Sequence, residues 1–169
     1  RRVYRRLISF ALKTALKKKG THTIVQNEED QEFCLNNLGL AAKDVSVIRG
    51  SGVDTTRFRP GPLRRRLPKR VLLASRYLID KGVREYFGAA RLILEKRSDV
   101  EFLIAGWPDK GNPSGIPLSE VREWEKLRGF RNLGRCHSMS QLLQSVDIFV
   151  LPSYREGLSM ALLEAAACA

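Results

Sequence analysis

Apolar positions along this chain fall into short segments typical of buried strands, which alternate with longer helix-favouring segments. From residue 69 onward, short segments rich in apolar residues predict strands at 70–75, 100–106, 130–133 and 147–151. Helix-favouring segments lie between and after them, at 82–96, 118–127, 140–146 and 158–167. This alternation predicts a parallel sheet with helices on both faces, which is a doubly wound, Rossmann-like α/β fold.

The first 49 residues show a shorter piece of the same alternation. We expect a helix over 1–19, a strand over 21–25, a helix from 28 to about 38 with Asn27 as its N-cap, and a strand over 45–48. The segment 50–68 contains three prolines and no apolar period, which favours a boundary. We therefore expect the end of a first Rossmann-like domain at 1–49, a linker at 50–68 and a second domain at 69–169, incomplete at its C-terminus. Because the chain begins with Arg1 and ends inside a helix, we expect a fragment of a longer protein.

The most specific chemistry lies near the end of the chain, where seven residues separate Glu156 from Glu164. The strand at 147–151 is followed by Pro152 and Gly157, which indicate a turn, and then by an almost uniformly apolar helix. Glu164 is therefore predicted to be a carboxylate on a buried helix. An ionised group without partners is costly there, so we expect it to meet hydrogen-bond donors or ligand hydroxyls.

Four residues that can bind ligands come directly after predicted strands, namely Arg76, Gly106, Arg135 and Glu156. Ligands of doubly wound sheets bind beyond the carboxyl ends of the strands. We therefore expect these residues to gather along one edge of the sheet, a prediction that depends on topology alone.

Several motifs, taken in their order along the chain, resemble those of a known enzyme family. The spacing Pro152-Ser-x-x-Glu156-Gly157-Leu158, followed by Glu164, resembles the signature of the family-4 retaining glycosyltransferases, which have the GT-B fold of two Rossmann-like domains. Segments 47–54 and 58–60 resemble their interdomain linker, Lys81-Gly82 together with Arg76 their donor-phosphate pair, and 102–106 the second strand of their donor domain. The resemblance covers most of residues 23–169.

This resemblance implies roles for individual residues of the second domain. Arg76 and Lys81 are expected to bind the diphosphate of a nucleotide-sugar donor and to stabilise the charge that develops as it leaves. Glu156, the third residue expected to be catalytic, corresponds to the glutamate associated with hydroxyls of the transferred sugar. Glu164 corresponds to the glutamate that accepts hydrogen bonds from the ribose hydroxyls, a pairing that suits two carboxylate oxygens.

The remaining donor-binding residues are implied mainly through their backbone groups. Gly106 ends the second strand, and Arg135 and Cys136 lie in the loop that corresponds to the nucleobase-binding loop of the family. The N–H groups of Gly157, Leu158 and Ser159 are expected to open the final helix and to meet phosphate or sugar oxygens.

The parent enzyme is accordingly expected to transfer a sugar from a nucleotide-sugar donor, predicted to be UDP-linked, to a lipid-linked or saccharide acceptor with retention of configuration. The match is with bacterial enzymes of envelope polysaccharide synthesis, and we expect the isolated fragment to be inactive. The chain contains no Asp-x-Asp pair and no His or Cys cluster with ligand spacing, so we expect neither a metal nor another cofactor. The alternative is a module that binds nucleotide sugars without catalysis.

The formal net charge of +12 is concentrated in two segments. Residues 1–19 hold eight Lys or Arg and no acid, and residues 57–70 hold seven more and again no acid. In the first segment Val3, Leu7, Phe10, Ala11, Ala15 and Leu16 recur at helical spacing. This basic amphipathic helix is expected either to contact an anionic membrane from its surface or to pack on the first domain.

The same charge suggests a basic module that binds phosphates or nucleic acid, but the aromatic residues argue against nucleic acid as a partner. Tyr4 and Phe10 do not form an interleaved stacking platform, and no nucleic-acid-binding signature is present. Cys34, Cys136 and Cys168 are odd in number and far apart, which favours a reducing, cytoplasmic compartment. We therefore expect a cytoplasmic protein that contacts the inner face of the cell membrane peripherally.

Overall fold

The structure is a computed structural model that describes residues 2–50, 52–62, 67–109 and 111–169. Its contacts divide the chain into two compact units, one up to Gly52 and one from Val53 to Ala169. Ser51 and residues 63–66 of the predicted linker lie outside the described residues, as does Arg1 of the predicted first helix.

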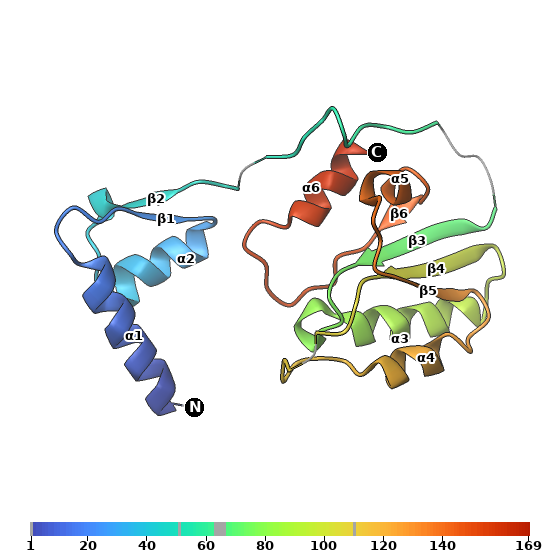
Figure 1. Ribbon diagram of the computed structural model, residues 1–169, viewed down its shortest axis with the longest axis horizontal. Coiled ribbons are helices and arrows are strands. Elements are labelled where there is room, and N and C mark those ends of the chain that lie inside the picture. Colours follow the sequence, from blue (N-terminus) through green and yellow to red (C-terminus); the bar gives the residue numbers. More distant parts are fainter. Residues whose placement is uncertain (1, 51, 63–66, 110) are drawn as a thin grey trace. The chain divides into compact units, whose positions relative to one another are not determined.

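The first unit contains two parallel strands and two helices (Figure 1). Its elements are α1 (Arg2–Leu16), β1 (Thr23–Val25), α2 (Glu28–Glu32) with a π-helical continuation (Phe33–Asn37), a 3-10 turn (Ala42–Asp44) and β2 (Val45–Val47). The Asn27 side chain caps α2 by accepting a hydrogen bond from the Asp30 N–H at 2.7 Å, which confirms the predicted N-cap. The small core of the unit consists of Cys34, Leu38, Leu40 and Val45.

Helix α1 exposes apolar side chains along most of its length. Tyr4 and Phe10 are 72% and 71% exposed, and Leu7 and Ile8 are also exposed. Leu16, the last residue of the helix, packs against the small core of the unit. The predicted amphipathic helix is therefore present, and within the described part of this unit most of its apolar side chains are exposed to solvent.

The second unit is built on a parallel sheet of four strands (Figure 1). The strands are β3 (Lys69–Ala74), β4 (Val100–Ala105), β5 (Phe130–Gly134) and β6 (Ile148–Phe149). Their order in the sheet is β5-β4-β3-β6, and every pairing is parallel. This arrangement confirms the predicted doubly wound, Rossmann-like α/β fold.

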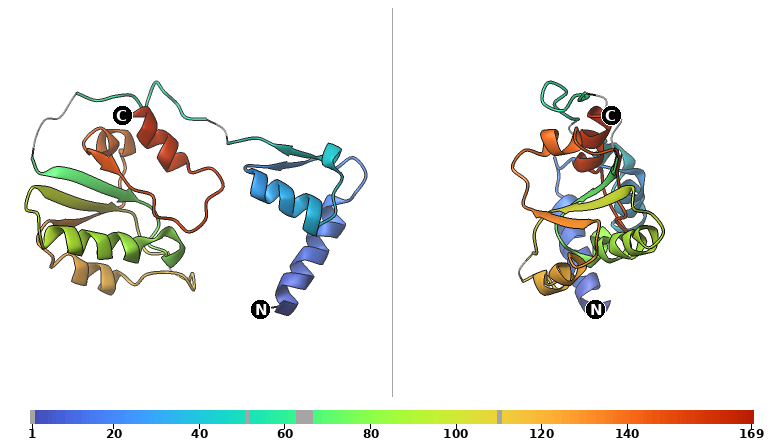
Figure 2. Two further views of the ribbon diagram at one scale, coloured as in Figure 1. Left: turned by 180° about the vertical axis from the view of Figure 1, so that it is seen from behind. Right: turned by 90° about the vertical axis from the view of Figure 1, so that its right-hand side faces the viewer.

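Helices cover both faces of this sheet. Figures 1 and 2 show α3 (Val83–Leu94) and α4 (Leu118–Trp124) on one face, and α5 (Met139–Leu143) and α6 (Met160–Ala167) on the other. Parallel strands require such crossover connections, and the helices bury the apolar faces of the strands. All four helices predicted after residue 69 are present, with ends shifted by a few residues.

The face beneath α5 and α6 has its own apolar cluster, formed by Phe58, Leu72, Ala74, Leu103, Ala105, Leu143 and Cys168. Phe58 is buried in it although it lies in the segment predicted as a linker. The Gln144 side chain also donates a hydrogen bond to the Arg59 carbonyl at 2.8 Å. Part of segment 50–68 therefore packs against the second unit.

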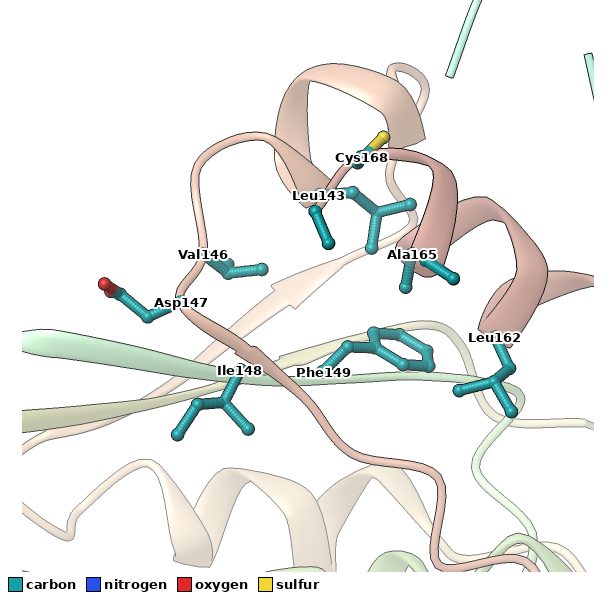
Figure 3. Close-up of a pocket in the computed structure, with 10 residues that line it drawn as sticks. Leu143, Val146, Asp147, Ile148, Phe149, Leu162, Ala165 and Cys168 are labelled. Carbon is teal, nitrogen blue, oxygen red and sulfur yellow. The ribbon is translucent and has the colours of Figure 1, made fainter. Parts of the chain in front are cut away.

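Strand β6 is shorter than predicted and is not buried. Only two of its residues pair with β3, whereas the sequence predicts a strand over 147–151. Ile148 is exposed because β6 has a neighbour on one side only among the described strands. Beside it lies an apolar cavity of about 230 Å³ between β6, α5 and α6, lined by Leu143, Phe149, Leu162 and Ala165 among others (Figure 3). The prediction of a buried strand is wrong here.

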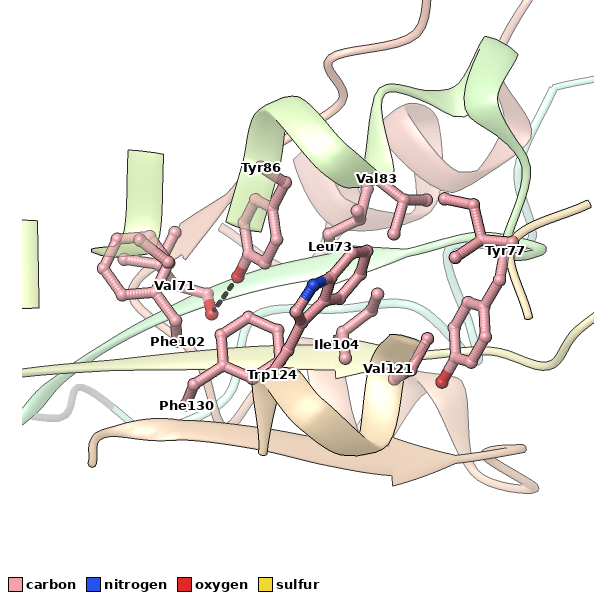
Figure 4. Packing of buried hydrophobic residues seen from close by; sticks show 12 residues of the cluster. Val71, Leu73, Tyr77, Val83, Tyr86, Phe102, Ile104, Val121, Trp124 and Phe130 are labelled. Carbon is pink, nitrogen blue, oxygen red and sulfur yellow. Dashed lines mark hydrogen bonds between the residues drawn. The ribbon is translucent and has the colours of Figure 1, made fainter. Parts of the chain in front are cut away.

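Aromatic side chains fill the opposite face, beneath α3 and α4 (Figure 4). Phe87 stacks on Trp124 with ring centroids 4.7 Å apart. The buried hydroxyl of Tyr86 lies 2.9 Å from the carbonyl oxygens of both Val71 and Leu103, which belong to adjacent strands. This core holds β3 and β4 in register, so the loops that leave their carboxyl ends start from a rigid base.

Candidate functional site

The carboxyl ends of β3 and β6 lie side by side at one edge of the sheet. From β3 the chain moves to β4 and β5 on one side, and it reaches β6 on the other side only afterwards. In an open parallel sheet, ligands bind in the crevice at such a reversal of strand order. The loops at this edge therefore form the candidate site.

The loop after β6 is pressed against the turn that follows β3. Gly82 has a left-handed backbone with φ of +67°, and a Cβ at this position would lie 2.2 Å from the Pro152 carbonyl oxygen. The Tyr154 N–H donates to the Asp80 carbonyl at 3.0 Å, and the Tyr154 hydroxyl donates to Glu85 at 2.5 Å. Since only glycine fits so close an approach in this conformation, the two loops act as one structural unit.

Lys81 and Glu156 form an ion pair across these two loops. Lys81 Nζ lies 2.6 Å from Glu156 Oε1, and the two side chains are 24% and 26% exposed. Partial burial disfavours the charged carboxylate, but the interactions with Lys81 and Ser153 together outweigh it, so the pKa of Glu156 lies below its ordinary value. The structure thus brings together two of the three residues that the sequence predicts to be catalytic.

Arg76 lies just beyond β3 and lines a cavity of about 190 Å³, together with Ala74, Ser75, Ala105, Gly106, Trp107, Cys136 and Met139. Arg76 Nη1 donates a hydrogen bond to Asp109 Oδ2 at 2.8 Å. Gly106 is required because a Cβ there would lie 1.8 Å from the Ser75 carbonyl oxygen. Arg76, Gly106 and Cys136 therefore share one small cavity at the predicted edge.

Arg135 follows β5 and stacks on an aromatic ring. Its guanidinium carbon lies 5.0 Å from the centroid of the Trp107 ring, which is a cation–π geometry. Cys136 is a free, half-buried thiol. Arg135 is thus held at the same edge as Arg76 by a residue of the loop between β4 and α4.

The start of α6 differs from the prediction. The Ser159 hydroxyl accepts a hydrogen bond from the Leu162 N–H at 3.4 Å, so Ser159 is the N-cap and the helix begins at Met160. A serine oxygen at this position satisfies an N–H group that the helix leaves unpaired. Gly157 and Leu158 therefore lie in the loop before the helix and do not open it.

Glu164 is less buried than predicted. None of the residues of α6 is fully buried, because the helix covers a sheet edge that is itself open among the described strands. Partial burial raises the pKa of the Glu164 carboxyl, and the charge of Arg57 opposes this shift. No hydrogen bond joins this carboxylate to the Lys81–Glu156 pair within the described residues.

Among the described residues, no group of three or more His, Cys, Asp or Glu side chains is placed so that it could hold a metal ion. The cationic groups Arg76, Lys81 and Arg135 are the charges that could meet an anionic ligand at this edge. The arrangement can therefore neutralise phosphate oxygens and accept hydrogen bonds from hydroxyl groups through Glu156.

Sequence reasoning did not identify Trp107 and Asp109, which contact Arg135 and Arg76. Both follow β4 within a few residues, and this position at the carboxyl end of a strand is the signal that could have identified them. Their contacts join segments about 30 residues apart in sequence, which no local pattern reveals.

Comparison with known proteins gives a consistent result. A family model described as glycosyl transferases group 1 matches residues 68–169. An N,N'-diacetylbacillosaminyl-diphospho-undecaprenol alpha-1,3-N-acetylgalactosaminyltransferase from Campylobacter jejuni is 34% identical over 157 residues, covering 86% of this chain and 39% of that protein. A UDP-Gal:alpha-D-GlcNAc-diphosphoundecaprenol alpha-1,3-galactosyltransferase from Escherichia coli is 29% identical over 178 residues, covering 96% and 43%. The chain thus spans about two fifths of the length of these relatives.

Solved structures share the fold at low sequence identity. Alr3699/HepE from Anabaena, in complex with UDP-glucose, matches 95% of this chain and 47% of its own, with a TM-score of 0.71 and 17% identity. A glycosyltransferase from Rickettsia africae matches 93% of this chain and 45% of its own, with a TM-score of 0.72 and 17% identity. At this identity the likeness shows the fold alone.

The approach of Gly82 to Pro152 predicts a large effect of a single methyl group. Gly82→Ala should lower the free energy of unfolding by at least about 2 kcal/mol, because it adds both a clash and a strained backbone. The matched control is Gly88→Ala in α3, where an added Cβ meets open space. This substitution should raise the free energy of unfolding by about 0.5–1 kcal/mol, because alanine favours a helix more than glycine does. Urea denaturation followed by tryptophan fluorescence measures both variants, and equal midpoints would contradict the close approach.

The two glutamates should respond to pH with opposite signs. The pKa of Glu156 is lowered, so its stabilisation is present above the ordinary value of 4.5 and is lost as pH falls through the lowered value. The pKa of Glu164 is raised, because the folded state disfavours its charged form. The protein is therefore more stable while Glu164 is protonated, and this stability is lost as pH rises through the raised value.

Relative to the unmodified chain, Glu156→Gln should therefore be less stable near neutral pH, and Glu164→Gln should be more stable there. Both differences should shrink at acid pH, where the glutamates are protonated. Melting temperatures measured from about pH 3 to about pH 7 test this, and changes of the same sign in both variants would rule it out.

Proposed function

Because the chain belongs to the glycosyl transferases group 1 family, we propose that its second unit binds the nucleotide-sugar donor of a glycosyltransferase. The observation that carries this proposal is the edge of the sheet at which Arg76 and the Lys81–Glu156 ion pair lie beside the reversal of strand order. We further propose that residues 1–49 are the end of an acceptor-side domain, that 50–68 is a linker and that 69–169 belong to the donor-side domain.

Arg76 and Lys81 are proposed to bind the diphosphate of the donor. A guanidinium and an ammonium can neutralise phosphate oxygens and stabilise the charge that accumulates as the nucleoside diphosphate leaves. They would supply here what a divalent cation supplies in metal-dependent transferases. Arg76 is half-exposed, and Lys81 is joined to Glu156 by a side-chain contact that a ligand can rearrange.

Glu156 and Glu164 are proposed to accept hydrogen bonds from donor hydroxyls. Glu156 lies beside Lys81, where the transferred sugar would follow the diphosphate. Glu164 lies half-buried on α6, and its carboxylate can pair with the two hydroxyls of a ribose. These hydrogen bonds would also offset the desolvation that raises the pKa of Glu164.

The remaining predicted residues are assigned to the two ends of the donor. Arg135 and Cys136, in the loop after β5, are proposed to lie beside the nucleobase, with Gly106 allowing close approach of the backbone. The N–H groups of Gly157, Leu158 and Ser159 precede or cap α6 and are proposed to meet phosphate or sugar oxygens.

The proposed reaction transfers the sugar to a lipid-linked or saccharide acceptor in polysaccharide synthesis, with retention of configuration. The bond between the anomeric carbon and the phosphate oxygen breaks, the acceptor hydroxyl oxygen bonds to the same carbon, and the hydroxyl proton passes to the leaving diphosphate. Relatives named for diphospho-undecaprenol acceptors support this class of acceptor, and one named for UDP-Gal supports UDP as the carrier. The isolated chain is expected to bind the donor without turning it over, because the reaction needs an acceptor domain.

Calorimetric titration with UDP tests the donor site directly. We expect saturable binding that Arg76→Ala and Glu164→Ala each weaken about tenfold or more, since each removes charge-assisted hydrogen bonds. The matched controls are Arg91→Ala and Glu95→Ala, which remove exposed charges from α3 and its C-cap and should leave binding unchanged. Comparison of the affinities for UDP and GDP identifies the nucleobase that the site prefers. Equal affinities of all four variants would show that the site is assigned to the wrong residues.

Helix α1 of the first unit suggests a second partner, the cytoplasmic surface of an anionic membrane. Helix α1 contains no acidic residue, and Tyr4, Leu7 and Phe10 are exposed on it. No helix in the described residues is long and apolar enough to cross a bilayer. We propose that α1 lies in the membrane interface, where apolar side chains enter and basic ones meet lipid phosphates. Packing against the rest of an acceptor domain is the competing explanation.

Sedimentation with lipid vesicles distinguishes these explanations. The chain should bind phosphatidylglycerol vesicles and not phosphatidylcholine vesicles, and Lys13→Glu with Lys17→Glu should weaken binding more than tenfold, since each basic residue near the surface contributes about 1 kcal/mol. Arg91→Glu with Lys96→Glu, an equal change of charge in the second unit, serves as the control. Equal losses in the two double variants would indicate net charge alone, and the absence of binding would favour packing within the protein.

A further inference from the structure

The loop between β4 and α4 contacts the guanidinium that the proposed function assigns to the donor diphosphate. Asp109 Oδ2 accepts a hydrogen bond from Arg76 Nη1 at 2.8 Å. The Arg76 side chain is 49% exposed and makes no other side-chain hydrogen bond to a described residue. Without Asp109, this long side chain would be free to occupy many rotamers.

Asp109 is itself held in place by its own loop. Asn112 Nδ2 donates to Asp109 Oδ2 at 3.2 Å, the same oxygen that receives Arg76. The Asn112 N–H donates to the Asp109 carbonyl, also at 3.2 Å. A Cβ at Gly115 would lie 3.0 Å from that carbonyl oxygen, so Gly115 packs closely against Asp109. The carboxylate therefore occupies a defined position.

The loop is also fastened to the segment that carries Arg76. Backbone N–H groups donate across the two segments at 2.8–2.9 Å, from Tyr77 to Trp107, from Ile79 to Ser114 and from Ile116 to Tyr77. Tyr77 is buried between them. Because backbone hydrogen bonds fix one segment against the other, the separation of Asp109 from Arg76 does not depend on surface side chains alone.

The Arg76–Asp109 pair is too exposed to add much to the stability of the fold. Its effect on a ligand can be larger. A guanidinium carries several N–H donors in a planar fork, and the contact with Asp109 uses one of them, which leaves others for phosphate oxygens. A side chain that is already ordered loses less conformational entropy when a ligand binds.

We infer that Asp109 is a positioning residue that orders the Arg76 guanidinium for the diphosphate of the donor. This inference rests on the proposed function and deepens it, because it assigns a role to a residue outside the signature motifs. The opposite role, in which Asp109 competes with phosphate for Arg76, predicts the opposite change in affinity when the carboxylate is removed.

Nuclear magnetic relaxation tests the ordering without any ligand. The order parameter of the Arg76 Nε–H group should fall below about 0.6 in Asp109→Ala and should be largely restored in Asp109→Asn, whose amide oxygen can still accept the hydrogen bond. Arg84, which makes two hydrogen bonds to Glu120, is the internal reference and should not change. An unchanged Arg76 order parameter in Asp109→Ala overturns the inference, whether or not the chain binds nucleotide.

Titration with UDP and with uridine separates positioning from a general structural effect. Asp109→Ala should weaken UDP binding about three- to tenfold, should leave uridine binding unchanged because uridine has no phosphate, and should be rescued by Asp109→Asn. Glu120→Ala, which frees Arg84 from a comparable ion pair, should leave both affinities unchanged.

Three outcomes of this titration overturn the inference. Tighter UDP binding in Asp109→Ala would show that Asp109 competes with phosphate for Arg76. Equal weakening of UDP and uridine binding would show that Asp109 acts only through the structure of the site. An unchanged UDP affinity would show that the ordering of Arg76 does not affect binding. Failure of the unmodified chain to bind any nucleotide contradicts the proposed function instead, and the relaxation measurement then decides whether Asp109 holds Arg76.

Discussion

Strand β3 pairs with β4 on one side and β6 on the other, and the rest of the candidate site depends on this double pairing. It makes β3 one of the two inner strands, with Leu72 and Leu73 fully buried on opposite faces. The loop after β3 is therefore flanked by the loops after both neighbours. Arg76 consequently meets Asp109 from one side, while Lys81 meets Glu156 from the other. A change of strand order would separate these contacts.

The charges at this edge are held in pairs of different strength. Lys81 and Glu156 are each about three quarters buried, so removing one partner would leave the other with an uncompensated charge of reduced hydration. Arg76 is more exposed, and its pairing with Asp109 restrains the side chain more than it stabilises the fold. An anionic ligand would therefore meet one cation that is largely buried in an ion pair and another that is more exposed and already ordered.

Much of this fold could be predicted because it follows from local patterns. The strands at 70–75 and 100–106 each contain a run of four apolar residues, and Asn27 before three acidic residues is a local capping signal. The burial of β6 and of α6 was mispredicted because burial depends on neighbouring elements, which are absent on one side of β6 among the described residues. Topology alone predicted that Arg76 and Glu156 would lie at one edge of the sheet, and the family resemblance added Lys81. Asp109 and Trp107 depend on contacts between distant segments.

Two of the motifs that carried the family resemblance contact each other directly. Lys81-Gly82 and Pro152-Ser-x-x-Glu156 lie some 70 residues apart, yet the Pro152 carbonyl approaches the space that Gly82 leaves open, and Glu156 pairs with Lys81. The spacing in the second motif lets its first residue reach Gly82 while its last reaches Lys81. The Pro152 carbonyl thus requires glycine at position 82, and the charge of Lys81 favours a carboxylate at position 156, without any ligand. The fold needs the close approach, and the same approach places a cation and a carboxylate at the mouth of the crevice.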